Sequence, residues 1–205
     1  DALRPQADDS ATRLHTVAGL VEMGRYEDAI RSITASSLLS QELSESLVER
    51  VGDASVAALL LSKAALASER GIEFLLSSDA DFSAASIESR DLVTIVGNLV
   101  DNALDAVRSP DCLERRVEVG LHSNDRGVEL TVKDSGPGIP GDIVERIFAE
   151  GFTTKSGDGR RPRGLGLALV MQVVRRYGGE IAVDTGGNTT FSGRLPPRAK
   201  AGGSG

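Results

Sequence analysis

The sequence predicts an α+β chain in which a helical hairpin precedes a mixed sheet that helices cover on one face. Residues 1–70 carry apolar side chains at helical spacing, whereas short β-type runs alternate with helices after Gly71. We therefore expect a hairpin domain over residues 1–70 and a sheet-containing domain over residues 71–197. Residues 198–205 are rich in glycine and are expected to form a flexible tail.

Composition limits the function classes. The chain has 205 residues, 40% of them hydrophobic, which suffices for one core and a smaller appendage. Its 23 basic and 30 acidic residues give a net charge of -7, which argues against nucleic-acid binding. The single cysteine, Cys112, excludes an internal disulfide. The longest apolar stretch, residues 56–67, is too short to cross a bilayer, so we expect no membrane segment.

The expected hairpin begins with a helix over residues 3–23 that ends at Gly24. A second helical stretch restarts over residues 26–35 and continues over residues 41–69, before Gly71 ends it. Two helices cannot enclose a core on their own. We therefore expect this hairpin to pair with a second copy in a four-helix bundle, which makes the protein a homodimer.

The second domain alternates strands with helices. The expected strands are residues 72–76, 117–122, 128–133, 181–184 and 190–195. The expected helices are residues 91–108, 141–149 and 164–177.

The helix over residues 91–108 carries an unusual polar edge. At 100° per residue, Asn98, Asp101, Asn102 and Asp105 fall in one narrow arc. A solvated face is the alternative interpretation, but such faces favour Lys, Glu and Arg, and asparagine is a poor helix former. Oxygen ligands of this kind suit magnesium, which keeps several waters and takes few protein ligands.

The next strand ends in a candidate acceptor for a ligand. Alternation along residues 128–133 carries Asp134 onto the inward face, where its carboxylate requires hydrogen-bond donors. Structural waters, backbone amides or an amino group on a ligand would serve. Gly136 and Gly138 follow at once and would let a planar group approach the backbone closely.

A glycine-rich polar run over residues 151–163 is expected to form a lid. Gly164 and Gly166 then open a helix whose free N–H groups and dipole can hold phosphate oxygens. Lys155 and the arginines before Gly164 would add positive charge. A solvated surface loop and a buried helix start remain the alternative interpretation of this segment.

These four motifs, in this order, resemble the GHKL superfamily, whose members share the Bergerat ATP-binding fold. The superfamily includes histidine kinases, type II topoisomerases, mismatch-repair ATPases and a chaperone class, and the resemblance covers residues 88–195. It implies ATP and magnesium as cofactors, with Asn98 and Asn102 holding the metal and the phosphates. It also implies that Asp134 accepts a hydrogen bond from the adenine amino group.

The resemblance assigns further residues to the site. Those implied in nucleotide binding are Asn98, Asn102, Asp105, Asp134, Gly136, Gly138, Ile139, Phe152, Thr153, Thr154, Lys155, Arg163, Gly164, Leu165, Gly166 and Leu167. Those implied in phosphoryl transfer are Asp101, Asn102 and Lys155.

The segments at residues 151–155 and 163–170 look most like a histidine kinase. The hairpin, in turn, resembles the dimerisation hairpin of citrate- and dicarboxylate-sensing kinases and of sporulation phosphotransferases. In those relatives a His-Glu-Phe stretch supplies the phosphoacceptor, but this chain has Asp8-Asp9-Ser10 there. His15 is an alternative acceptor, although a packing or interface role suits a hairpin histidine better.

Two functions follow as hypotheses. The first is the ATP-binding catalytic core of a two-component sensor kinase, which transfers the γ-phosphoryl group to a histidine and then to a response regulator receiver domain. The second is a catalytically silent ATP-binding pseudokinase or phosphotransferase-like scaffold. A topoisomerase- or repair-type ATPase ranks last, because its further domains are absent from this sequence. We expect a cytoplasmic location, including as the cytoplasmic part of a membrane-anchored sensor.

Overall fold

The structure is a computed structural model that describes residues 19–21, 23–26, 28, 41–82, 87–110, 112–149, 151–152 and 165–197. Asp8 and His15, for which the sequence predicts roles, lie outside the described residues. The same holds for the predicted site residues Thr153, Thr154, Lys155, Arg163 and Gly164, and for the predicted tail at residues 198–205.

A five-stranded mixed sheet forms the base of the domain, with the strand order β1-β2-β3-β5-β4. β1 pairs with β2 in parallel, and the other neighbours are antiparallel. The strands are β1 Glu73–Leu76, β2 Arg116–Asn124, β3 Gly127–Asp134, β4 Glu180–Asp184 and β5 Thr189–Leu195. Each of the five predicted strands overlaps one of these, which confirms the mixed sheet.

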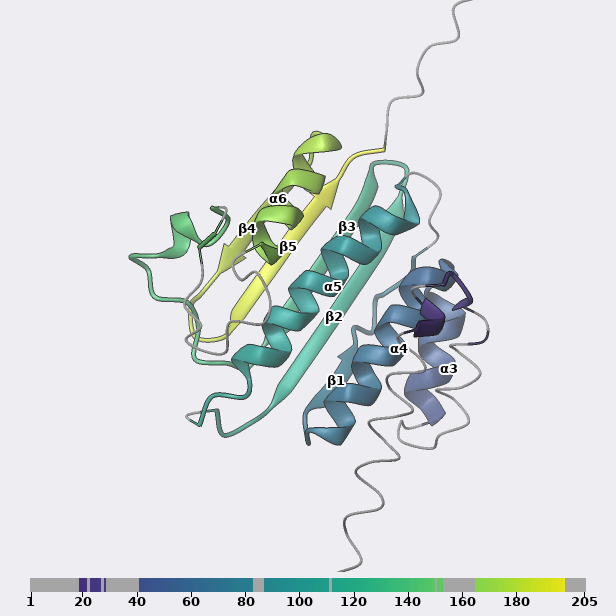
Figure 1. Cartoon of the computed structure of the whole chain (residues 1–205), viewed down its shortest axis with the longest axis horizontal. Coiled ribbons are helices and arrows are strands. Elements are labelled where there is room, and N and C mark those ends of the chain that lie inside the picture. Colours follow the sequence, from purple (N-terminus) through teal and green to yellow (C-terminus); the bar gives the residue numbers. More distant parts are fainter. Residues whose placement is uncertain are drawn as a thin grey trace, which may run out of the picture.

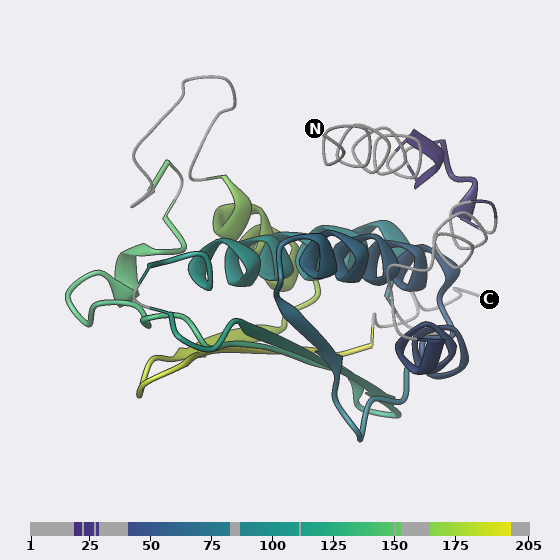
Figure 2. The same cartoon turned by 90° about the horizontal axis from the view of Figure 1, so that it is seen from below.

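Three helices lie side by side on one face of this sheet, as Figures 1 and 2 show. They are α4 Ala54–Glu69, α5 Ser89–Ala106 and α6 Gly166–Arg176. Among the described helices none covers the other face, and strand β3 explains this: Val128, Leu130 and Val132 are buried beneath the helices, whereas the residues between them are exposed and polar. A polar outer face is stable in water without a second helical layer.

The sequence predicted one continuous helix over residues 41–69, and this was wrong. The segment divides into α3, Gln41–Arg50, and α4. Asp53 caps α4, because its Oδ1 accepts from the backbone N–H groups of Ser55 at 2.9 Å and Val56 at 3.0 Å. Gly52 N–H donates instead to the carbonyl of Phe82 at 2.7 Å, so the chain extends the sheet edge at this point.

Helix α4 packs into the same core as α5 and the sheet. Leu60, Leu61 and Ala64 are almost completely inaccessible to solvent, and Leu59 lies 3.6 Å from the position of a Cβ on Gly97 of α5. Among the described residues, none of the helices combines the length and the apolar character that a membrane crossing requires.

The predicted helix over residues 141–149 was also wrong. Only Val144–Arg146 forms a helical turn, and it is a 3-10 turn. The Arg146 N–H donates to the carbonyl of Ile143, and the Ala149 N–H donates to that of Arg146. Tertiary packing fixes this segment, since the Phe148 ring meets the ring of Phe191 edge to face at a centroid distance of 6.3 Å.

Candidate functional site

The polar edge of α5 is half open to solvent and faces α6. Asn98, Asn102 and Asp105 are half-buried, whereas Asp101 is exposed. The Asn98 side chain has a fixed orientation, because its Nδ2 donates to the Thr94 carbonyl at 2.7 Å. Its Oδ1 is therefore directed away from the helix backbone and is available to a ligand.

The first residue of α6 touches this edge. A Cβ built on Gly166 would lie 2.8 Å from Asn98 Oδ1, so no larger residue fits without displacing that amide. Within the described part of the chain, no side chain caps the first N–H groups of α6. A helix N-terminus of this kind favours an anion, both through its N–H groups and through its dipole.

Asp134 ends β3 with a buried carboxylate, as the alternation of that strand predicted. The residue is 2% exposed, and its Oδ1 accepts from the Gly136 N–H at 2.9 Å. Burial raises the pKa of Asp134 to about 6, and the bond from Gly136 opposes this shift only in part. The residue is therefore a buried acceptor with capacity for a further donor.

Both glycines of the turn are required by their surroundings. A Cβ on Gly136 would lie 2.7 Å from Asp134 Oδ1 and 3.0 Å from the Cβ of Ala106, at the C-terminal end of α5. Gly138 has a φ of +82°, which residues with a side chain rarely adopt. The turn thus keeps its backbone close to Asp134 and to α5.

Thr189 is a neighbour of Asp134 that the sequence analysis missed. It is the cross-strand partner of Asp134 in β5, and it is 3% exposed. A buried threonine at the start of a strand gives no signal by itself. Only the register between β3 and β5 brings it beside the carboxylate.

A buried cluster fixes α6 against α5. The Tyr177 hydroxyl donates to Asp91 Oδ2 at 2.7 Å, and Arg176 Nη2 donates to Asp91 Oδ1 at 3.0 Å. The same hydroxyl accepts from the Glu88 N–H at 3.2 Å. Desolvation is the main cause that raises the pKa of Tyr177, so the hydroxyl stays protonated and keeps donating. These contacts hold the C-terminal end of α6 while its N-terminus meets Asn98.

The other predicted site residues within the described ranges lie around this centre. Ile139, Phe152 and Leu167 are half-buried and pack against the core, and Leu165 is 37% exposed. The Arg146 guanidinium lies over the Phe152 ring, 5.1 Å from its centroid. This cation–π contact positions Phe152 at the start of the predicted lid.

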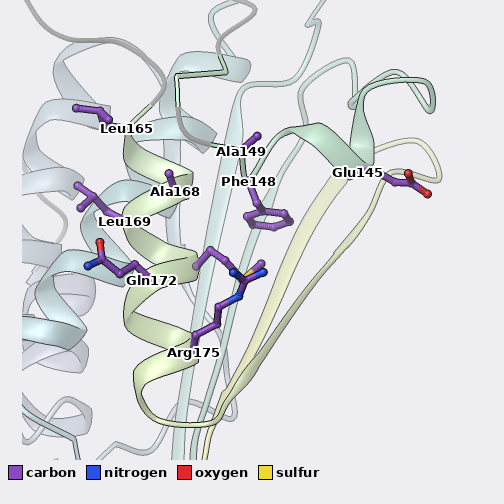
Figure 3. A pocket seen from close by; sticks show the side chains of 9 residues that line it. Glu145, Phe148, Ala149, Leu165, Ala168, Leu169, Gln172 and Arg175 are labelled. Atoms are coloured by element: carbon purple, nitrogen blue, oxygen red, sulfur yellow. The ribbon is translucent and has the colours of Figure 1, made fainter.

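A cavity of about 680 Å³ lies between α6 and the segment around Phe148 (Figure 3). Its described lining residues are Glu145, Phe148, Ala149, Leu165, Ala168, Leu169, Met171, Gln172 and Arg175. Ala168, Met171 and Arg175 project from the side of α6 opposite Gly166. The described lining includes Leu165, which the sequence analysis assigned to nucleotide binding, but not Asn98, Asp134 or Gly136.

Residues 87–199 match the family described as histidine kinase-, DNA gyrase B- and HSP90-like ATPases, which is more than half of the chain. The chain belongs to this family. The match begins just before α5 and includes both the Asp134–Gly138 turn and α6. At the level of the family, the chain carries the ATP-binding catalytic domain of sensor histidine kinases.

Individual relatives agree with this assignment. A probable C4-dicarboxylate sensor kinase of Halalkalibacterium halodurans is 35% identical over 202 residues, which is 97% of this chain and 37% of that protein. The sensor histidine kinase DcuS of Escherichia coli K12 is 33% identical over 187 residues, 90% of this chain and 33% of that protein. This chain therefore spans about a third of the length of these relatives.

A solved structure shares the fold. The mycobacterial sensor histidine kinase MprB superposes with a TM-score of 0.51 and 30% sequence identity, over 71% of this chain and 96% of that one. The predicted resemblance to dicarboxylate-type sensor histidine kinases and the predicted α+β fold are thus confirmed.

Proposed function

We propose that the catalytic domain binds magnesium-ATP along α5, with the adenine at Asp134 and the phosphates at the N-terminus of α6. The observation that carries this proposal is the spacing of the two ends of the site. Gly166 meets α5 at Asn98, whereas Gly136 meets it at Ala106, eight residues later. Eight helical residues span about 12 Å, so a base and its phosphates would occupy the two ends of one groove.

The side chains at each end suit the parts of the nucleotide that they would hold. Asp134 keeps acceptor capacity for the adenine amino group, and Gly136 leaves room beside it. At the other end, the amide oxygens of Asn98 and Asn102 would hold magnesium, a hard cation that prefers oxygen ligands. The orientation of the Asn98 amide fits this role, because its nitrogen is already bonded to Thr94. When bound, the metal supplies charge neutralisation for the phosphates.

We propose further that the complete protein transfers the γ-phosphoryl group to a histidine and then to the receiver domain of a response regulator. Such transfer depends mainly on positioning and on electrostatic stabilisation. Asp101 and Asn102 would lie beside the transferred group, and Lys155 with Thr153, Thr154, Arg163 and Gly164 would close over it. A homodimer that forms through the hairpin would bring the phosphoacceptor residue of one protomer to a catalytic domain.

A second candidate function rests on Asp8. The chain has an aspartate at the position where its resemblance to hairpin kinases implies the acceptor histidine. A carboxylate cannot form the phosphoramidate that a histidine forms. The alternative is an ATP-binding scaffold that docks a response regulator without phosphorylating itself.

Two measurements test the proposal. Titration calorimetry with magnesium-ATP is expected to give saturable binding to the wild-type chain and none to Asp134→Asn, since the single amide oxygen of asparagine would accept from the Gly136 N–H and its NH2 group would face the adenine amino group as a second donor. Unchanged affinity in Asp134→Asn would remove the proposed adenine site.

Labelling with γ-³²P-ATP separates the two candidate functions. If the catalytic machinery is active, Asp8→His acquires acid-labile label, and His15→Ala in the same background leaves that label in place. If Asp8→His binds ATP but acquires no label, the scaffold function is favoured. Label on the wild-type chain that His15→Ala removes would identify His15 as the acceptor.

A further inference from the structure

Lys63 is an isolated charge on an otherwise apolar helix. It is the only charged residue between Ala54 and Ser68 of α4, a helix that buries nine side chains in the core. Its own side chain is 19% exposed, and its Nζ lies 2.5 Å from Oδ1 of Asp101 on α5. A lysine that serves only solubility would extend into solvent instead of across a neighbouring helix.

The partner of Lys63 lies on the proposed phosphate site. Asp101 is one helical turn from Asn98 and adjacent to Asn102, on the side of the polar edge that is nearer α4. Its side chain is 54% exposed, so it lies on the open surface of α5. Asp105, the second carboxylate of this edge, lies 3.8 Å from Arg108.

These carboxylates create an electrostatic difficulty for a triphosphate. A unit charge about 6 Å from a phosphate, at an effective dielectric constant of about 40–80, changes the binding affinity about threefold to tenfold. An unneutralised Asp101 would therefore repel the very group that Asn98 and the N-terminus of α6 attract. The ion pair with Lys63 removes that repulsion and holds the carboxylate toward α4.

We propose that Lys63 is a positioning residue of the nucleotide site, which acts through Asp101 and makes the site selective for a triphosphate over a diphosphate. This inference rests on the proposed binding of ATP along α5. The preference for the triphosphate follows from charge, because a triphosphate adds one more phosphate charge than a diphosphate for an unneutralised Asp101 to repel.

A purely structural role predicts a different result. An ion pair with one exposed partner adds little to stability, so its removal would change the unfolding midpoint slightly and both nucleotide affinities equally. Methionine keeps the unbranched apolar stem of lysine and therefore preserves the packing of α4 against α5. Lys63→Met thus separates the charge of Lys63 from its packing.

The test compares the dissociation constants of magnesium-ATP and magnesium-ADP at low ionic strength, by calorimetry on the full chain. We expect Lys63→Met to weaken ATP binding about threefold to tenfold and ADP binding by a smaller factor. Lys63→Arg should restore the ATP affinity. The matched control is Lys133→Met, since Lys133 is exposed on the outer face of β3 and its loss changes the net charge equally.

Asp101→Asn, alone and combined with Lys63→Met, completes a double-mutant cycle. It leaves the Lys63 charge unpaired and should bind ATP more tightly than wild type, while the double variant should return close to wild-type affinity. A double variant that binds as weakly as Lys63→Met would show that Lys63 contacts the phosphates directly, and this would overturn the proposal. An unchanged ratio of ATP to ADP affinity in Lys63→Met would also overturn it. If the wild-type chain binds neither nucleotide, the proposed function itself fails.

Discussion

The site for a Cβ atom on Gly166 lies 2.8 Å from Oδ1 of Asn98, which is closer than such atoms approach in folded proteins. The N-terminus of α6 and the polar edge of α5 are therefore in direct contact across a residue without a side chain. This contact brings together a source of free N–H groups and an amide oxygen. It depends on the relative position of the two helices.

The first prediction concerns this contact. In Gly166→Ala the added methyl group displaces the Asn98 amide or pushes α6 outward, so ATP binding should weaken by about tenfold, which corresponds to about 1.4 kcal/mol. Calorimetry measures the change. Gly141→Ala is the matched control, because nothing lies within 4 Å of a Cβ at Gly141 and its φ is not positive. Equal affinities for both variants would exclude a role for the contact.

The second prediction concerns the pH dependence of stability. Burial raises the pKa of Asp134 from 3.8 to about 6 in the folded state. The stability that its protonation provides is fully present below about pH 4 and is lost as the pH rises through 6. Asp134→Asn should therefore raise the melting temperature by several degrees at pH 8 and by much less at pH 4.5. Thermal unfolding followed by circular dichroism checks this, and an equal shift at both pH values would contradict it.

The third prediction concerns the cluster at Tyr177. In Tyr177→Phe the buried Asp91 carboxylate loses the hydroxyl donor, although Arg176 remains within 3.0 Å. The free energy of unfolding should fall by about 1–3 kcal/mol, and ATP affinity should fall with it because α6 is held less firmly. Urea denaturation and calorimetry measure the two effects. Tyr26→Phe alters the only other tyrosine of the chain and serves as the control. Lower stability with unchanged ATP affinity would show that the cluster does not position α6.

The sequence predicted the parts of the fold that depend on local pattern. Alternation along β3 placed Asp134 on the buried face, and the helical period placed Asn98, Asp101, Asn102 and Asp105 on one edge of α5. Both patterns repeat over several residues, so one periodicity fixes which side chains are buried. The order of the motifs then identified the family.

Sequence patterns did not predict the features of the structure that depend on contacts with distant segments. The interruption between α3 and α4 forms because Gly52 bonds to Phe82, thirty residues later, although Asp53 followed by Ser55 was a capping signal that the sequence contained. Lys63 lies beside Asp101 only through helix packing, and Thr189 lies beside Asp134 only through strand register. No local pattern along the chain specifies those pairings.

The last prediction concerns where the catalytic domain begins. A boundary at residue 70 would leave α4 in the hairpin, but Leu60, Leu61 and Ala64 of this helix are almost completely buried in the core with α5. Exposing three such side chains costs several kcal/mol, at about 0.8 kcal/mol per buried CH₂ group, against a total stability of about 5–15 kcal/mol. A fragment of residues 41–197 should therefore unfold cooperatively and bind ATP with wild-type affinity, whereas a fragment of residues 72–197 should show no cooperative unfolding transition. A fragment of residues 53–197 retains the Asp53 cap and α4, and its melting temperature measures how much α3 contributes. Cooperative unfolding and wild-type ATP affinity in residues 72–197 would place α4 outside the catalytic domain.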